Sequence, residues 1–458
     1  MYMTTAGQGH RADEVPTASV NDVASRTGGK ALLAGGTMLA VAMTAANAGN
    51  YLLNLVLGRW LTPAEFADAN LMVTLMLLVT AIAVALQLIS ARFASIHQAR
   101  GTDERAEAVA ARLRKVALLS GFGLLVLLAA PAQWWAGVFN TESAWPFVIL
   151  AAGMPCYLLQ AVGRGLLQGR LRFGSLAMTF VLEMIVRLLA GLGLVAAGLG
   201  VEGATLGLTL SFVATWLIVR RAQPSVAAAP MQVDEIISLR IYALPVIVLL
   251  IGQIVINNGD VLVVKAFFPS ERAGVYSAIA LIGRAVFFLS WSAVTTLFPA
   301  VAQRDERGQG SNDLLLVGVG VVGGACALMT GAIAVGGDRF FTGVFGPEYA
   351  GVQHLLVQYA IATSFFAIAN LIVTYHLSAN RAIESRLLVV GAFIQTVLLL
   401  SNHHSLSAVL VDQLIAMGVL LVAVVATTLM VRPRPSQVST TTNLTAVAVP
   451  STGGVHGA

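Results

Sequence analysis

Apolar segments separated by short polar stretches follow one another along nearly the whole chain. A helix needs about 20 mostly apolar residues to cross roughly 30 Å of hydrocarbon. The pattern therefore predicts an all-α polytopic membrane protein with about twelve transmembrane helices. The predicted spans lie near 31–57, 67–90, 115–138, 144–167, 173–197, 201–219, 241–267, 273–300, 313–335, 350–377, 384–401 and 406–430.

The distribution of Lys and Arg predicts the orientation of these spans. With the N-terminus in the cytoplasm, most of the 27 Lys and Arg residues, including Arg164, fall in cytoplasmic segments. The residues left in outer turns are Arg59, Lys265, Arg272 and Arg339, and those left within spans are Arg187 and Arg284. Cytoplasmic loops of membrane proteins carry such an excess of positive charge. We expect both termini to be cytoplasmic.

Polar stretches divide the predicted spans into two halves. The spans group into an N-terminal lobe, 31–219, and a C-terminal lobe, 241–430, joined by the charged, Pro-containing linker 220–240. Residues 1–30 read as a flexible cytoplasmic tail without the apolar core of a signal peptide. Residues 431–458, rich in Ser, Thr, Pro and Gly, read as a disordered tail.

An internal repeat is indicated by the first outer turn of each half. Because each half holds an even number of spans, any repeat must be parallel. A shift of 207 residues places Asn50 on Asn257 and Trp60 on Phe267, each aromatic residue at the point where the chain enters a charged turn. We therefore predict two six-helix lobes related by a pseudo-two-fold axis.

Composition excludes a soluble enzyme. Charged residues are 11% and hydrophobic residues 57% of the chain, and the mean hydropathy is +0.82. Soluble domains carry about 25% charged residues. The two cysteines, Cys156 and Cys326, lie in apolar runs and imply neither a disulfide framework nor a metal site. The net charge of +5 is explained by the cytoplasmic basic residues and requires no nucleic-acid partner.

Two predicted spans carry a polar stripe at helical spacing. The stripes are Asn47, Asn50 and Asn54 in the first span, and Gln253, Asn257 and Asp260 in the seventh. Polar groups are unfavourable against lipid, so both stripes should face protein or water. Hydrogen bonding between helices is the plainer interpretation for the amides, and less so for the charged Asp260.

Three further ionisable residues lie deep in spans. Glu183 and Arg187 are four residues apart and can pair along one helix face, either as a self-neutralising structural pair or as a site. Arg284 has no acidic residue within a turn of it. It could pair with Asp260 or Glu183, or it could grip a phosphate through two parallel hydrogen bonds.

No pattern of residues supports a chemical step. The chain lacks a recognisable Ser/His/Asp set, an HExxH motif and paired catalytic acids in a loop. We therefore expect a protein that is not an enzyme and that has no cofactor and no catalytic metal.

Two stretches resemble a known family. The stretch LGRWLTPAEFADANLMVTL, from Leu57, resembles the "G-x-x-L-T-P-x-E-F-G" turn of the multidrug/oligosaccharidyl-lipid/polysaccharide (MOP) exporter superfamily, with Ala67 where glycine is usual. The stretch FFPSERAGVYSAIALIGR, followed by LFPAV, resembles the start and end of the family's eighth span through Gly274, Tyr276 and Pro299. The chain is most similar to the Wzx-type O-antigen and exopolysaccharide lipid flippases of that superfamily.

The resemblance implies two lobes around a central cavity. Such proteins carry polyprenyl-pyrophosphate-linked sugars from the inner to the outer leaflet by alternating access, driven by H⁺, Na⁺ or the membrane potential. The lipid II flippase branch also has an arginine in its eighth span, but nearer the outer end than Arg284, and usually has fourteen spans.

We therefore predict a flippase of the bacterial inner membrane. The substrate would be a lipid-linked oligosaccharide, contacted by Arg284, Arg187, Asn257, Asn50 and Asn47. The coupling cation, H⁺ or Na⁺, would be sensed by Asp260 and Glu183. Other expected partners are membrane lipids and polysaccharide polymerase or assembly proteins.

Two alternatives remain open. A drug/cation antiporter of the same superfamily would favour an acidic cavity, whereas two arginines here balance two acids. A non-transporting component of a polysaccharide assembly complex is the other alternative. A polymerase would show a large outer loop, and the predicted outer loops are short.

Overall fold

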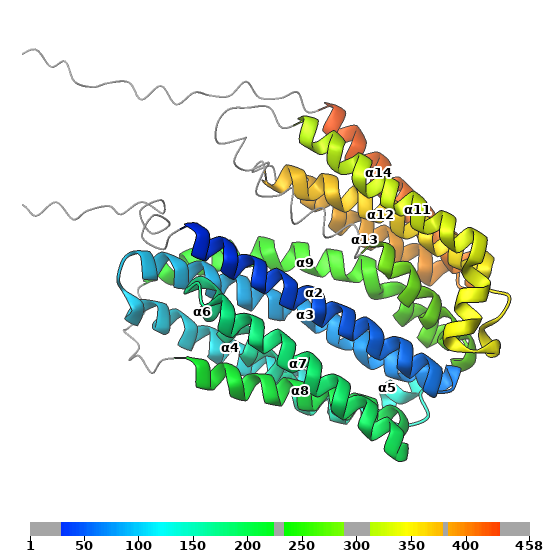
Figure 1. Cartoon of the computed structure of the whole chain (residues 1–458), viewed down its shortest axis with the longest axis horizontal. Coiled ribbons are helices and arrows are strands. Elements are labelled where there is room, and N and C mark those ends of the chain that lie inside the picture. The colour runs from blue at the N-terminus through cyan, green and yellow to red at the C-terminus, as the bar shows by residue number, and fades with distance from the viewer. Residues whose placement is uncertain (1–28, 224–232, 288–311, 379–382, 431–458) are drawn as a thin grey trace, which may run out of the picture.

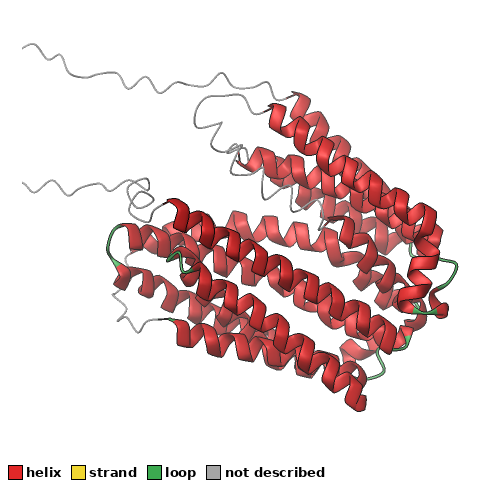
Figure 2. Ribbon diagram, in the orientation of Figure 1, coloured by secondary structure: helices red, strands yellow, loops and turns green. Residues whose placement is uncertain are grey.

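The computed structural model describes residues 29–223, 233–287, 312–378 and 383–430. Every regular element in these residues is helical (Figure 2). Both predicted tails, apart from the last residues of the first, and most of the predicted linker lie outside these ranges. Of the linker, α8 takes up residues to Ala222 and α9 takes up residues from Val233.

The first half forms six helical passes. They are α2 (Gly29–Trp60), α3 (Pro63–Ala99), α4 (Asp103–Ala129) with the short α5 (Ala132–Val138), α6 (Trp145–Gly169), α7 (Phe173–Leu194) and α8 (Gly200–Ala222). The third pass begins at Asp103, twelve residues before the predicted span 115–138. It is bent by 64° where α4 meets α5.

The second half repeats this order. It contains α9 (Val233–Phe267), the helical residues 270–287, α11 (Asn312–Phe345), α12 (Gln353–Ser378), α13 (Ile383–Ser401) and α14 (Leu406–Met430). In Figure 1 the helices from α2 to α8 form one group, α11 to α14 form another, and α9 lies between them.

The number of spans depends on where the long helices are bent or interrupted. Among the described residues, eight helices are long and apolar enough to cross a membrane, or nine if the bent α4–α5 pair is one span. That count joins α7 and α8, although Gly198 and Gly200 have positive φ angles and the chain reverses there. A Cβ on Gly207 would lie 2.4 Å from Gly191, so α7 and α8 pack closely against each other. Together with the shorter α13 and the partly described segment 270–287, this gives the twelve predicted passes.

Several described helix ends follow the predicted 207-residue repeat. The offset takes Trp60 to Phe267, the ends of α2 and α9, and Val138 to Phe345, the ends of α5 and α11. It also takes the end of α7 to the end of α13. Since these described ends keep the same spacing in each half, the two halves repeat one order of helices.

The Thr-Pro-x-Glu motif after the first span is a helix start. Thr62 is the N-cap of α3, its hydroxyl accepts from the Glu65 backbone N–H, and the Glu65 carboxylate accepts from the Thr62 backbone N–H at 2.9 Å. Pro63 occupies the first turn, where the missing N–H is not needed. Such a capping box satisfies two helix-end donors. Phe66 is fully buried and packs against Phe345 of the other half.

Close backbone contacts join the halves at one end. A Cβ on Gly274 would lie 1.9 Å from the carbonyl oxygen of Pro63, and one on Gly58 would lie 2.5 Å from the Phe345 ring. In Figure 1 the halves come together at the right-hand end, where α2 and α9 end, and lie apart at the opposite end. The distribution of basic residues predicts that the joined end is the outer one.

Candidate functional site: two charged clusters within the helix bundle

A cluster of ionised side chains lies inside the first half. Glu183 of α7 lies between two guanidinium groups, with Arg164 of α6 at 2.6 Å and Arg187 one helical turn further along α7. Arg187 also donates a hydrogen bond of 2.7 Å to the side-chain oxygen of Asn50 on α2. The cluster therefore joins three helices through one carboxylate.

Both arginines of the cluster are firmly held. Arg164 donates to the hydroxyl and to the backbone carbonyl of Thr179, each at 3.0 Å, and its guanidinium lies over the Phe180 ring. Arg187 donates to the Ser211 hydroxyl at 3.3 Å. Both arginines are buried. Bonds of this kind fix the direction of a guanidinium and preorganise it for an anion.

The cluster carries one more positive charge than negative. Arg164 and Arg187 share the single carboxylate of Glu183. Arg164, which the sequence analysis counted among the cytoplasmic residues, is buried and turned toward α7. The predicted balance of two arginines and two acids therefore becomes an excess of arginine. Glu183 lies about 15 Å along the axis from the first residue of α7, near mid-membrane.

A second cluster lies inside the other half. The Asp260 side chain of α9 is fully buried, and one of its oxygens accepts from the hydroxyls of Tyr276 and Tyr359, each at 2.9 Å. Its other oxygen lies 3.5 Å from the Arg284 guanidinium. Tyr276 lies 3.3 Å from the Gln413 side-chain oxygen of α14. The carboxylate thus has two tyrosine donors and one distant arginine.

Arg284 makes a side-chain hydrogen bond with Tyr359 and only a loose contact with Asp260. Its contact with Asp260 is at the outer limit for a hydrogen bond, and its Nε atom is buried without a hydrogen-bond partner. The pairing with Asp260, which the sequence left open, is therefore present but weak. An arginine with unused donors can take a further acceptor at little structural cost.

The predicted amides separate into different environments. Asn50 belongs to the arginine cluster, and Asn47, one turn away on α2, is exposed. Asn257 donates to the backbone of its own helix, at Gln253. Gln253 donates to Asn370 of α12 at 3.1 Å, the plain helix–helix bond expected as the alternative. The repeat relates Asn50 to Asn257, but their partners differ.

Other ionisable groups are also buried, near the ends of predicted spans. Lys265, predicted in an outer turn, is buried and lies 2.6 Å from the buried carboxylate of Asp68. Asp412 of α14 is buried beside Asn402. These residues stand near predicted span ends, where sequence alone does not separate buried from solvated charge. Within the described ranges, no group of three or more possible metal ligands occurs.

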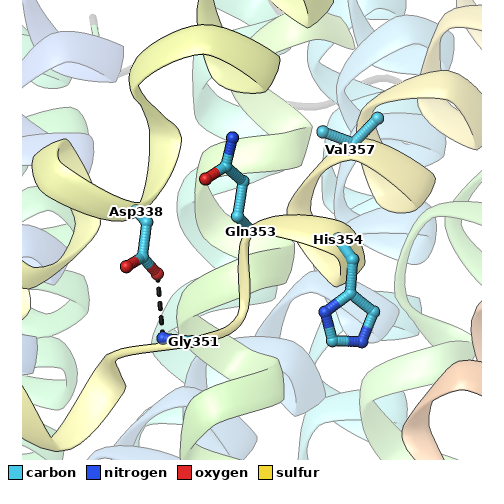
Figure 3. Close-up of a pocket in the computed structure, with 5 residues that line it drawn as sticks. All are labelled: Asp338, Gly351, Gln353, His354 and Val357. Carbon is cyan, nitrogen blue, oxygen red and sulfur yellow. Dashed lines mark hydrogen bonds between the residues drawn. The ribbon is translucent and has the colours of Figure 1, made fainter.

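One pocket opens between the end of α11 and the first turns of α12. It has a volume of about 590 Å³ and is lined by Asp338, Gly351, Gln353, His354 and Val357. Figure 3 shows the Asp338 carboxylate directed at the Gly351 backbone N–H, from which it accepts a hydrogen bond of 2.9 Å. This carboxylate therefore holds a turn, and the pocket adds no group to the charged clusters.

Sequence reasoning missed Arg164 and the two tyrosines. Tyr276 had been noted only as part of the "G-x-Y" resemblance, and Tyr359 stood in an apolar run without any signal. Both tyrosines meet Asp260 across helices, a relation that spacing along one helix cannot reveal. Arg164 could have been found from its position inside the predicted span 144–167.

A model of a known protein family matches more than half of this sequence. Residues 32–304 match the family model described as "Polysaccharide biosynthesis protein". No curated protein sequence matches the chain significantly.

Solved transporters have the same fold at low sequence identity. A multidrug resistance MATE family transporter of the MOP superfamily, in an inward-facing conformation, superposes with a TM-score of 0.70 at 14% identity, covering 83% of this chain and 93% of that one. The lipid II flippase MurJ, in an inward closed conformation, gives 0.69 at 11% identity, with 87% and 88% covered. A MATE structure in the bent conformation gives 0.60 at 14% identity, with 86% and 93% covered.

The family model spans more than half of the chain and includes both motif turns, and the helix order is that of MOP-superfamily transporters. As the sequences around Thr62 and Gly274 predict, the chain belongs to the polysaccharide biosynthesis protein family and has the MOP-superfamily fold.

Proposed function

We propose that this protein is a flippase that moves a polyprenyl-pyrophosphate-linked oligosaccharide, or a related polysaccharide precursor, from the cytoplasmic to the outer leaflet. One observation carries the proposal: the buried Arg164–Glu183–Arg187 cluster holds an excess positive charge. An uncompensated cation inside a membrane protein is costly. An anionic headgroup supplies the missing charge.

The chemistry of the cluster fits a pyrophosphate. Guanidinium groups bind phosphate oxygens through two parallel, charge-assisted hydrogen bonds. Arg187 places a guanidinium on α7, and its partner Asn50 places a side-chain amide on α2. Asn47 adds an exposed amide on α2. In the other half, Arg284, with its unused Nε donor, and Asn257 complete the proposed set of substrate contacts.

Coupling to a cation is assigned to the carboxylates, and Asp260 is the better placed of the two. Glu183 already neutralises part of two arginines, whereas Asp260 has only a distant cationic partner. H⁺ or Na⁺ arriving at Asp260 would replace Arg284 as the counter-charge. Arg284 would then be free to bind the anionic headgroup, so cation binding and substrate binding would be linked.

The two halves act as the moving units in this proposal. The lobes 31–219 and 241–430, joined by 220–240, would rock against each other so that the headgroup faces the cytoplasm and then the outer side. We assign the protein to the bacterial inner membrane with both termini in the cytoplasm. Lipids surround it, and polymerase or assembly proteins would take the delivered sugar. The protein itself carries out no chemical step and needs no cofactor.

A direct binding measurement separates this function from drug export. Purified protein is titrated with a polyprenyl pyrophosphate, the matching polyprenol and a lipophilic cationic dye. We expect saturable binding of the pyrophosphate, weaker by about tenfold or more in Arg187→Gln, since one charged hydrogen bond contributes roughly 1.5–3 kcal/mol. The exposed Arg220→Gln is the matched control. Preference for the dye would favour the cation antiporter, and binding of none of the probes would favour a non-transporting component.

A further inference from the structure

The two halves are joined at their closed end by a buried ion pair. The Lys265 ammonium of α9 lies 2.6 Å from the Asp68 carboxylate of α3, and both side chains are buried. These two residues belong to different halves of the repeat. Their positions have no charged counterparts, because the 207-residue offset relates Lys265 to Gly58 and Asp68 to Val275.

The turn between α5 and α6, in the first half, contacts this ion pair. Lys265 also donates to the backbone carbonyl of Asn140 at 3.2 Å and to the Ser270 hydroxyl at 3.1 Å. The Asn140 side chain donates to the Ala266 carbonyl at 3.2 Å, and the Glu142 backbone N–H donates to Asp68 at 3.3 Å. Beside the ion pair, the ammonium thus donates two hydrogen bonds, one of them to a second segment of the opposite half.

Asn140 adopts the backbone conformation that this contact requires. Its φ angle is +49°, in the left-handed region that asparagine tolerates better than most residues. The turn between α5 and α6 thereby aims both the carbonyl and the amide of Asn140 at the end of α9. The connection between the halves is therefore built from side chains and backbone together.

We propose that Asp68 and Lys265 form a latch that holds the outer end closed and sets how often it opens. Parting α3 from α9 exposes both charges to water, where each is solvated without its partner. Removing one charge leaves the other buried and unpaired only while the end is closed, so it destabilises the closed state. The latch requires only that the halves separate at this end, and it does not depend on which substrate is carried.

Thiol labelling measures this opening. In full-length protein with Cys156→Ala and Cys326→Ala, a reporter cysteine replaces Ala69, which is buried near the junction, and a membrane-impermeant maleimide is applied. We expect Lys265→Met or Asp68→Asn to raise the labelling rate by about tenfold, a usual size for the loss of one coupling in a two-state equilibrium. The double variant Asp68→Asn/Lys265→Met should label faster than the parent, because the ion pair is lost, but more slowly than the single variants, because no unpaired charge remains.

Two controls separate opening at the latch from loss of a surface charge and from general unfolding. Arg272→Met removes an exposed cation near the same end and should leave the rate unchanged. A second reporter at Ala110, buried in α4, reports general unfolding in permeabilised membranes. The latch is overturned if the single variants label Ala69→Cys at the parent rate, if the double variant labels at the parent rate, or if both reporters rise together.

Discussion

Arg164 and Glu183 are joined at 2.6 Å across α6 and α7. Because this contact already neutralises the carboxylate, the second arginine on Glu183, Arg187, keeps a positive charge that no described neighbour cancels. In the proposed function, a pair that would be purely structural with one arginine becomes an anion site with two. The proposed function depends on this excess of one positive charge, with two arginines within hydrogen-bond distance of one carboxylate.

Removing Arg164 should therefore weaken substrate binding without removing the group that touches substrate. In Arg164→Met the cluster is neutral, because Glu183 then pairs with Arg187 alone. We expect the affinity for a polyprenyl pyrophosphate to fall by about tenfold, roughly 1.4 kcal/mol, and to recover in part in Arg164→Lys. Titration of purified protein measures it, with Arg221→Met as an exposed control. Unchanged affinity in Arg164→Met would show that net charge does not govern the site.

Arg284 should be needed for transport. Its loose contact with Asp260 and its unused Nε atom leave donors for a phosphate. We expect Arg284→Ala to lower flipping by at least about tenfold, since hydrogen bonds to charged groups contribute roughly 1.5–3 kcal/mol. Arg284→Lys should restore only part of the activity, because an ammonium cannot bind two oxygens in parallel. Flipping is measured at matched protein levels, and normal transport by both variants would rule out the assigned role.

Asp260 should connect transport to the cation gradient. In Asp260→Asn the acceptor remains but the charge is gone, so transport should lose its dependence on an imposed H⁺ or Na⁺ gradient. Tyr276→Phe removes one of the two hydroxyls on the carboxylate and should change the cation concentration that gives half-maximal rate, while retaining the dependence. Initial rates at several imposed gradients measure both effects. An Asp260→Asn protein that still follows the gradient would move the coupling site elsewhere.

Gly274 should be required for the junction of the halves. A Cβ there would lie 1.9 Å from the Pro63 carbonyl oxygen, so Gly274→Ala forces the backbones apart. Such overpacking costs about 1–3 kcal/mol, and we expect a clear drop in the thermal unfolding temperature of the purified protein. Gly320→Ala on α11 is the control, because its added Cβ would meet no atom within 4 Å. Equal stability of the two variants would contradict the close approach.

Much of the architecture was predictable because a membrane imposes strong rules. Segment length and charge asymmetry predicted twelve passes, and the Asn50–Asn257 match revealed a 207-residue repeat that the helix ends follow. The capping residues Thr62 and Glu65 lie within the stretch that carried the family resemblance. These features depend on local sequence, so they can be predicted without knowing which helices pack against each other.

The arrangement of the site was less predictable for a physical reason. Arg164, Tyr359 and Lys265 acquire their roles from helices that are distant in sequence. A charge near a span end can snorkel to water or turn inward to a partner, and the sequence does not say which. The structure resolves that choice for Arg164 and Lys265, and both turn inward.

The proposed flippase function is tested most directly by measuring flipping by the purified protein in liposomes. A polyprenyl pyrophosphate bearing a fluorescent disaccharide is incorporated, and quenching from outside reports its movement between leaflets. We predict that the protein speeds this movement, that Arg187→Gln with normal reconstitution does so at least about tenfold more slowly, and that a lipophilic cationic dye is not exported. Transport of the dye with no movement of the pyrophosphate lipid would contradict the central claim.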